Sequence, residues 1–151
     1  MAEERRGLPM SELLFQSKGW QVASIDDNAI TDRSAYVPVT AMDESAVILN
    51  CYQPGQADDM HCHPKEEHTF LVWKGKLHVT GVEDGEELTL VPGQFVTIDA
   101  NYYYRLHNPG PEPAVYCQFR TVPLKQPKRR MVPFSESARG KRAAAEAAKR
   151  S

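Results

Sequence analysis

Residues 55–75 read GQADDMHCHPKEEHTFLVWKG, and they contain three of the five histidines in the chain. His61 and His63 are two residues apart, so in a β-strand they project to the same face, with Cys62 reversed. Neutral imidazole is a ligand for Zn, Fe, Cu and Ni ions. Together with His68, the pair predicts a metal site, against the alternative of histidines on the solvent face of an edge strand.

The segments around these histidines predict an all-β domain. Segments rich in β-branched and aromatic residues are bounded by turn residues such as Pro54-Gly55 and Asn108-Pro109-Gly110. We expect strands at 46–52, 69–73, 76–80, 88–91, 95–98, 103–106 and 114–122. No helical period lies between them. Many short antiparallel strands at this spacing are typical of a barrel or jelly roll.

The spacing of residues 55–75 resembles the first motif of the cupins. That motif is Gly, five residues, His-x-His, three or four residues, Glu, six residues and Gly. Gly55, the two histidines and Gly75 fit it, and His68 occupies the glutamate position. The resemblance implies that His61, His63 and His68 are metal ligands.

Glu67 is the alternative to His68 in this motif. It would break the six-residue gap to Gly75, and it lies on the opposite strand face from His68. A β-bulge is the local change that would turn it inward. The spacing therefore favours His68.

The second cupin motif is Pro-x-Gly, two residues, His, three residues and Asn, and residues 99–108, DANYYYRLHN, resemble it in part. Asn108 fits, and Asn101 replaces the glycine, since both residue types tolerate positive φ. Tyr104 stands where the fourth ligand, a histidine, would be. His107 is the reserve ligand, which would enter the barrel only through a bulge.

The resemblance covers roughly residues 44–122 and implies a cupin-type jelly-roll barrel. We place the barrel at residues 36–124, after a short N-terminal arm at 1–35 that is either one turn of helix or a strand. A basic C-terminal tail follows at 125–151. Small cupin barrels usually pair through strand exchange or sheet contact, so we expect a homodimer, with the residues before Ala46 supplying the arm.

Three imidazoles with an open or tyrosine-filled position leave room for water, substrate or dioxygen, as catalytic metals require. Within the cupins, three-histidine iron sites are associated with dioxygenases that cleave carbon–carbon bonds of chelating substrates. The leading hypothesis is therefore a non-heme iron dioxygenase that acts on a small oxygen-bearing molecule. Its cofactor would be one divalent ion, Fe(II) first, with Zn, Ni or Mn as alternatives.

Two residues are candidates for catalysis beside the metal. Tyr104 would be a ligand, a hydrogen-bond donor, a base if a metal lowers its pKa, or a plain buried tyrosine. Arg120 lies on a late strand, and if it faces inward it would hold a substrate carboxylate or enolate. A surface salt bridge is its alternative role.

Two other functions remain open. The first is a Lewis-acid isomerase, cyclase or lyase that uses Zn or Ni with Tyr104 as base. The second is a non-catalytic cupin that binds a small molecule. The sequence contains no phosphate-binding Gly-rich loop, no Gly-x-Gly-x-x-Gly and no Gly-x-Ser-x-Gly.

Charge is distributed unevenly along the chain. The 151 residues have a net charge of −2, but residues 125–151 hold nine Lys and Arg against two Glu, a net of +7. The Ala-rich end of this tail, with Ser as an N-cap, has good helix propensity. Its charge alone would permit binding to nucleic acid or an acidic surface. Because it has almost no large apolar residue, we favour a solvated or disordered tail, or one that lies against the acidic barrel, over nucleic-acid binding.

The chain also bears on location. No apolar stretch approaches the 18 residues that a membrane span needs, and the sequence does not start with an apolar signal core. Three cysteines without regular spacing favour reduced thiols in a cytoplasmic protein. Cys62, reversed relative to its neighbours, is expected to be a passive surface or interface thiol and not a ligand.

Overall fold

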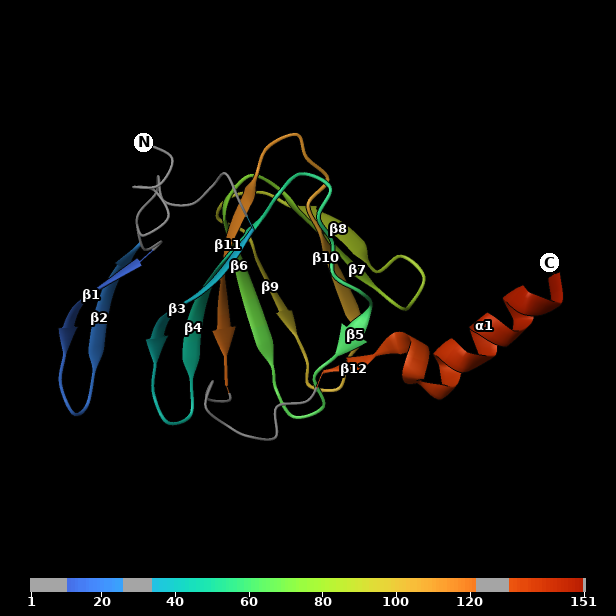
Figure 1. Cartoon of the computed structure of the whole chain (residues 1–151), viewed down its shortest axis with the longest axis horizontal. Helices are drawn as coiled ribbons and strands as arrows, with labels where there is room; N and C mark the ends of the chain where they lie inside the picture. The colour runs from blue at the N-terminus through green and yellow to red at the C-terminus, as the bar shows by residue number, and fades with distance from the viewer. Residues whose placement is uncertain (1–10, 26–33, 122–130, 151) are drawn as a thin grey trace.

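The computed structural model describes residues 11–25, 34–121 and 131–150, and it contains two five-stranded antiparallel sheets (Figure 1). The first sheet has the order β3 (Ala35–Ala41), β4 (Ala46–Tyr52), β11 (Ala114–Arg120), β6 (His68–Lys74) and β9 (Phe95–Ile98). The second has the order β12 (Val132–Pro133), β5 (His61–Cys62), β10 (Tyr104–His107), β7 (Leu77–Gly81) and β8 (Glu87–Leu90). Each predicted strand is present, and the jelly-roll prediction is confirmed.

The barrel core lies between the two sheets. The side chains that alternate toward the interior form one buried cluster: Phe70, Val72, Leu77, Val79, Leu90, Tyr104, Leu106 and Tyr116. A second cluster, which includes Leu49 and Cys117, lies on the other face of β4 and β11, where Ile25 packs. β4 and β11 are therefore packed on both faces, and this packing holds in place the side chains at the ends of the two strands.

Backbone conformation explains the two glycines that frame the first motif. Gly55 has φ of 84° and Gly75 has φ of 73°, in the left-handed region that favours glycine. A Cβ on Gly75 would also collide with the carbonyl oxygen of Pro113. Asn101 has φ of 63°, which confirms the prediction that it takes the place of a glycine.

Asn108, the last residue of the second motif, organises a turn. It is fully buried, and its Nδ2 donates to the carbonyls of Tyr52 at 2.8 Å and Glu112 at 2.9 Å. Its Oδ1 accepts from the Gly110 N–H at 2.8 Å. The residue therefore ties the loop between β10 and β11 to the end of β4.

The C-terminal segment returns to the barrel and covers β5. Val132 pairs with Cys62 and Pro133 with His61, and the Phe134 N–H donates to the Met60 carbonyl at 2.7 Å. Cys62 is 2% exposed. The expectation of a surface thiol is therefore wrong, because strand parity cannot foresee the contact between Cys62 Sγ and Asn101 Oδ1, at 3.9 Å, while an interface role stays a prediction.

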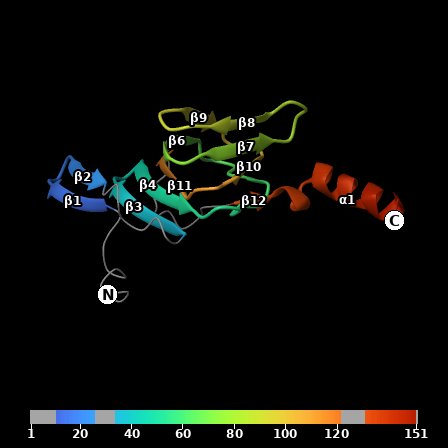
Figure 2. The ribbon, with the colours of Figure 1, turned by 90° about the horizontal axis from the view of Figure 1, so that it is seen from above.

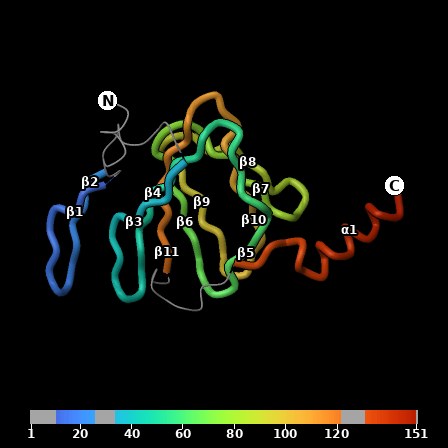
Figure 3. The backbone as a smooth tube through the Cα atoms, viewed as in Figure 1, coloured from blue at the N-terminus to red at the C-terminus, as the bar shows by residue number. Residues whose placement is uncertain are grey.

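Beyond β12 the chain forms a short 3₁₀ helix, Phe134–Glu136, and then α1 (Ala138–Arg150). The Gly140 N–H donates to the Ser137 side chain at 2.9 Å, so serine caps the helix as predicted. Arg139 forms an ion pair with Glu83 at 2.7 Å. The helix thus starts on the barrel and then leads away from it (Figure 3), and its residues after Gly140 are exposed.

Near the start of the chain, β1 (Ser11–Gln16) and β2 (Gln21–Ile25) form a separate antiparallel hairpin. Residues 11–25 of the arm therefore form a strand pair and not a helical turn. The Ala41 N–H donates to Gln21 Oε1 at 3.0 Å, which ties the hairpin to β3. In the view from above, the hairpin and α1 lie on opposite sides of the barrel (Figure 2). Among the described residues, no helix has the length and apolar character needed to span a membrane.

Candidate metal centre

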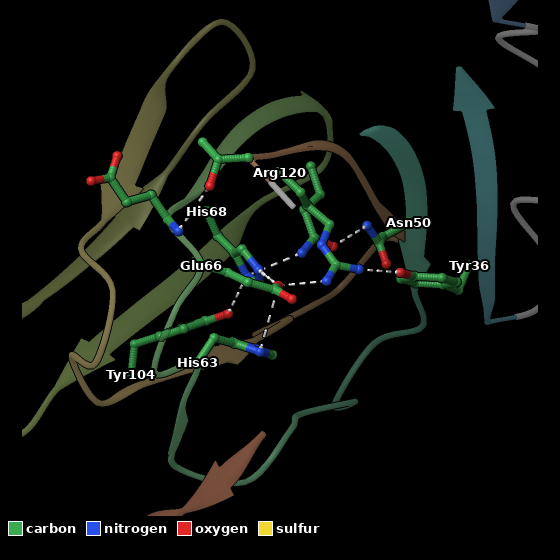
Figure 4. A network of polar contacts seen from close by, with 10 residues as sticks. Tyr36, Asn50, His63, Glu66, His68, Tyr104 and Arg120 are labelled. Atoms are coloured by element: carbon green, nitrogen blue, oxygen red, sulfur yellow. Dashed lines mark hydrogen bonds and ion pairs between the residues drawn. The ribbon is translucent and has the colours of Figure 1, made fainter. Parts of the chain in front are cut away.

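Two histidines and a glutamate converge at one end of the barrel (Figure 4). The ligand atoms of His63, Glu66 and His68 all lie within 4.8 Å of one another. His68 begins β6, and the other two lie in the turn between β5 and β6, where the Glu66 N–H reaches the His63 carbonyl at 3.5 Å. Imidazole and carboxylate groups at this separation could hold a metal ion.

Glu66 is the residue that the sequence interpretation missed. Glu66 is 5% exposed. Glu67, the alternative considered for the motif, is exposed, and the backbone N–H of Glu67 donates to Thr121 Oγ1 at 3.4 Å. Parity contained the signal, because a residue two positions before an inward-facing His68 projects to the same side. The motif spacing drew attention to the neighbouring carboxylate instead.

His68 faces inward, as the spacing favoured, and it is 1% exposed. Its Nε2 lies 2.8 Å from Glu66 Oε2, and its Nδ1 lies 3.1 Å from both the Tyr104 hydroxyl and Gln118 Nε2. A carboxylate only accepts, so Nε2 donates to Glu66. A metal ion that binds between these two atoms would take the place of that proton.

His61 lies beside this cluster but is not one of the three residues that meet within 4.8 Å. Its ring centroid is 5.0 Å from that of His63 and 4.5 Å from that of Tyr104. Its Nδ1 lies 2.6 Å from the Asp59 carbonyl oxygen, which can only accept. Nδ1 therefore has the proton, and Nε2 is left as the atom able to bind a metal. His61 as a ligand stays a prediction.

Tyr104 is 3% exposed and is brought next to the histidines from the start of β10. Burial raises the pKa of its hydroxyl, and the nearby charge of Asp58 raises it further. The phenol is therefore protonated at neutral pH and acts as a hydrogen-bond donor. A role as base needs a metal ion to lower this pKa.

His107 stays outside the barrel. β10 pairs with β7 without a bulge, from Tyr104 opposite Gly81 to His107 opposite His78. Tyr104 and Leu106 are buried, so His107 projects the other way. The structure gives no basis for the reserve ligand.

Arg120 is buried at the end of β11, with 2% of its surface exposed, so the alternative of a surface salt bridge is wrong. Its Nη2 lies 2.5 Å from Glu66 Oε2, and its Nη1 donates to the Tyr36 hydroxyl at 3.0 Å. Its buried Nε has no hydrogen-bond partner among the described residues. The guanidinium thus holds the carboxylate of the cluster in place.

These contacts set the protonation states of the site. Burial on its own would raise the pKa of Glu66, but hydrogen bonds from His68 and Arg120 and the charge of Arg120 outweigh it and lower that pKa. Burial lowers the pKa of His63 to about 3, with help from the neighbouring histidines. At neutral pH the site therefore offers an ionised carboxylate and a neutral imidazole, the forms that bind metals.

Residues 48–119 match the family model described as Cupin domain. The chain contains a cupin domain. Among curated proteins, none matches the chain significantly.

Solved structures share the fold of this cupin domain. The protein TT1209 of Thermus thermophilus is 24% identical, with a TM-score of 0.55 over 60% of this chain and 85% of that one. A Klebsiella pneumoniae protein with a double-stranded β-helix domain is 20% identical, with a TM-score of 0.56 over 66% and 84%. A cupin superfamily protein of Desulfitobacterium hafniense is 13% identical, with a TM-score of 0.54 over 63% and 83%. At these identities the likeness concerns the fold alone.

Proposed function

We propose that this cupin domain binds one divalent metal ion through His63, Glu66 and His68 and acts as a metal-dependent enzyme on a small oxygen-bearing organic molecule. The observation that supports the proposal is that a half-buried imidazole, a buried imidazole and a buried, ionised carboxylate lie within 4.8 Å of one another. Two histidines and one carboxylate with open positions form the donor set of non-heme Fe(II) oxygenases. An Fe(II) dioxygenase is therefore the reaction we propose first.

The donor set differs from the three neutral imidazoles inferred from the motif. A carboxylate ligand lowers the net charge of the ion and its ligands taken together. His61 Nε2 remains the adjacent atom able to act as a further ligand. When bound, the ion would supply a Lewis acid for a chelating pair of oxygens, and with iron also a means of activating dioxygen. The chain's own residues would then hold the substrate and control protons.

Arg120 and Tyr104 have different roles in this proposal. Arg120 contacts Glu66 and Tyr36, so we assign it the positioning of the Glu66 carboxylate and not direct contact with substrate. The Tyr104 hydroxyl lies 3.1 Å from His68 Nδ1 and would donate to the oxygen of a bound substrate. Because its pKa is raised, it would donate a hydrogen bond before it removed a proton.

The same hydroxyl supports a second candidate, a Lewis-acid isomerase, cyclase or lyase with Zn or Ni. The Tyr104 phenol would serve as base if a metal held by His68 lowered its pKa. This reaction would proceed without dioxygen. A non-catalytic binding role is the outcome if neither reaction occurs.

Metal analysis and oxygen consumption test the proposal. Protein purified without added metal should hold about one ion per chain, and the His63→Ala/His68→Ala double variant should hold only background. Iron-loaded protein should consume oxygen with catechols or β-diketones, whereas Tyr104→Phe should retain the metal and lose rate. Turnover by zinc- or nickel-loaded protein without oxygen would favour the second candidate. Equal metal content in both proteins would overturn both enzyme proposals.

We also propose that the chain forms a homodimer through the β1–β2 hairpin. Five large apolar side chains of this hairpin are 38–61% exposed: Leu13, Leu14, Phe15, Trp20 and Val22. A two-stranded hairpin is at best marginally stable alone in water, so a second copy of the chain is the natural cover for it. Light scattering should give twice the chain mass of 17.0 kDa. Leu14→Lys/Trp20→Lys should shift the protein to monomer, and a wild-type monomer would contradict the proposal.

A further inference from the structure

A cavity of about 590 Å³ opens beside the candidate metal centre. It is flanked by β8 and β9, the edge strands of the two sheets. Tyr104 lines it, and the Tyr104 hydroxyl lies 3.1 Å from His68 Nδ1. Tyr104 therefore lines the cavity and also contacts the metal cluster. The volume is that of an ordinary small-molecule site.

The walls of the cavity are apolar. Val79, Leu90 and Tyr104 belong to the barrel core, and Val96 and Ile98 pack against it. At the opening, Leu88 is 64% exposed and Phe95 is 60% exposed. Large apolar side chains exposed at the rim of an apolar cavity favour a ligand with an apolar body.

The charges at the cavity have one sign. Glu86, Glu87 and Asp99 line it, and among its described lining residues none is Lys, Arg or His. The Tyr102 hydroxyl lies 2.8 and 2.7 Å from the two carboxylate oxygens of Glu86. The Glu83 N–H also donates to Glu86 Oε1, at 2.9 Å. These donors fix the position of the Glu86 carboxylate at the rim.

Arg139 is a described cation whose charge acts on Tyr102 of the cavity lining, and it is already paired with a carboxylate. Arg139 pairs with Glu83 at 2.7 Å and donates to the Val82 carbonyl at 3.2 Å, and it does not line the cavity. An anionic ligand would leave water to lie among three carboxylates, with the charge of Arg139 already compensated by Glu83. A neutral or cationic ligand meets no such repulsion.

We infer that the substrate of this site is an apolar, ring-sized molecule without negative charge, either neutral or cationic. The inference rests on the proposed function and narrows it. It excludes phosphorylated and carboxylated molecules, such as sugar phosphates and sugar acids, and it favours neutral chelators, such as a catechol or a β-diketone, that ionise only on a metal.

Three phenols of matched size and different charge test the inference: 4-ethylphenol is neutral, tyramine is cationic and 4-hydroxyphenylacetate is anionic. Their dissociation constants are measured by ligand-observed NMR on the metal-free protein in chelator, so that the result does not depend on a bound ion. We expect the anion to bind roughly tenfold more weakly than the other two. Equal or tighter binding of the anion would overturn the inference, and so would the absence of binding by all three.

Variants separate charge from shape. Glu86→Gln/Glu87→Gln/Asp99→Asn keeps the shape of the rim and should remove most of the penalty on the anion. Val96→Trp should fill the cavity and abolish binding of all three phenols, whereas Thr89→Trp, on the other face of β8, should not. If Val96→Trp binds the phenols like wild type, they bind elsewhere and the inference fails. If the protein discriminates against the anion but never binds a metal, the inferred charge selectivity holds and the proposed function fails.

Discussion

His63→Ala should lower the metal content of the purified protein from about one ion per chain to background. The substitution removes one of the two imidazoles in the cluster, and His63 is neutral at neutral pH because burial lowers its pKa to about 3. A lost direct ligand should weaken binding by more than the roughly 10–100-fold that follows loss of a supporting group. Metal analysis after dialysis against weak chelator measures the effect.

Two histidines provide matched controls for this substitution. His78 lies on β7, where it contacts Thr89 and Glu87 on the outer face, and His107 projects away from the barrel interior. His78→Ala and His107→Ala should keep the wild-type metal content. His61→Ala settles the remaining ligand, with loss of metal as in His63→Ala if Nε2 coordinates. If His107→Ala lowers the metal content as much as His63→Ala does, the cluster is not the metal site.

The sequence was sufficient to predict the barrel because strands and turns are local features. β4 and β9 begin and end at the residues predicted from the β-rich runs 46–52 and 95–98. Gly55, Gly75 and Asn101 occupy positions where positive φ is needed, which is also local information. Each of these signals depends on residues that are close together in the chain.

The site was only partly predictable, because its completion depends on contacts between distant segments. Glu66 is held inside by Arg120, which lies 54 residues later. Cys62 is buried, and its Sγ contacts Asn101 Oδ1, which lies 39 residues later. A motif spacing indicates which histidines meet, but it does not indicate which neighbouring carboxylate finds a buried cation.

Arg120→Met should lower the free energy of unfolding of the metal-free protein by about 3–5 kcal/mol at neutral pH. The Arg120 and Glu66 side chains are 0% and 4% exposed, so the substitution leaves a buried carboxylate without its cation. Met fills much of the volume of the arginine, which limits the loss from packing. Glu66→Gln/Arg120→Met removes both charges and should recover most of the stability. Denaturant unfolding in chelator measures all three proteins.

The pH dependence of this loss distinguishes charge from packing. The folded-state pKa of Glu66 lies below its ordinary value of 4.5, so its carboxylate contributes stability above that pH, and the contribution is lost as the pH falls toward the folded pKa. Without Arg120 the carboxylate can protonate more readily. The difference in free energy of unfolding between wild type and Arg120→Met should therefore become smaller as the pH is lowered from about 7 to about 4. His63 is present in both proteins, so the protons that it takes up on unfolding largely cancel in the difference. If this difference in free energy of unfolding does not change with pH, the arginine acts through packing alone. The assignment of Arg120 as the residue that positions an ionised Glu66 would then fail.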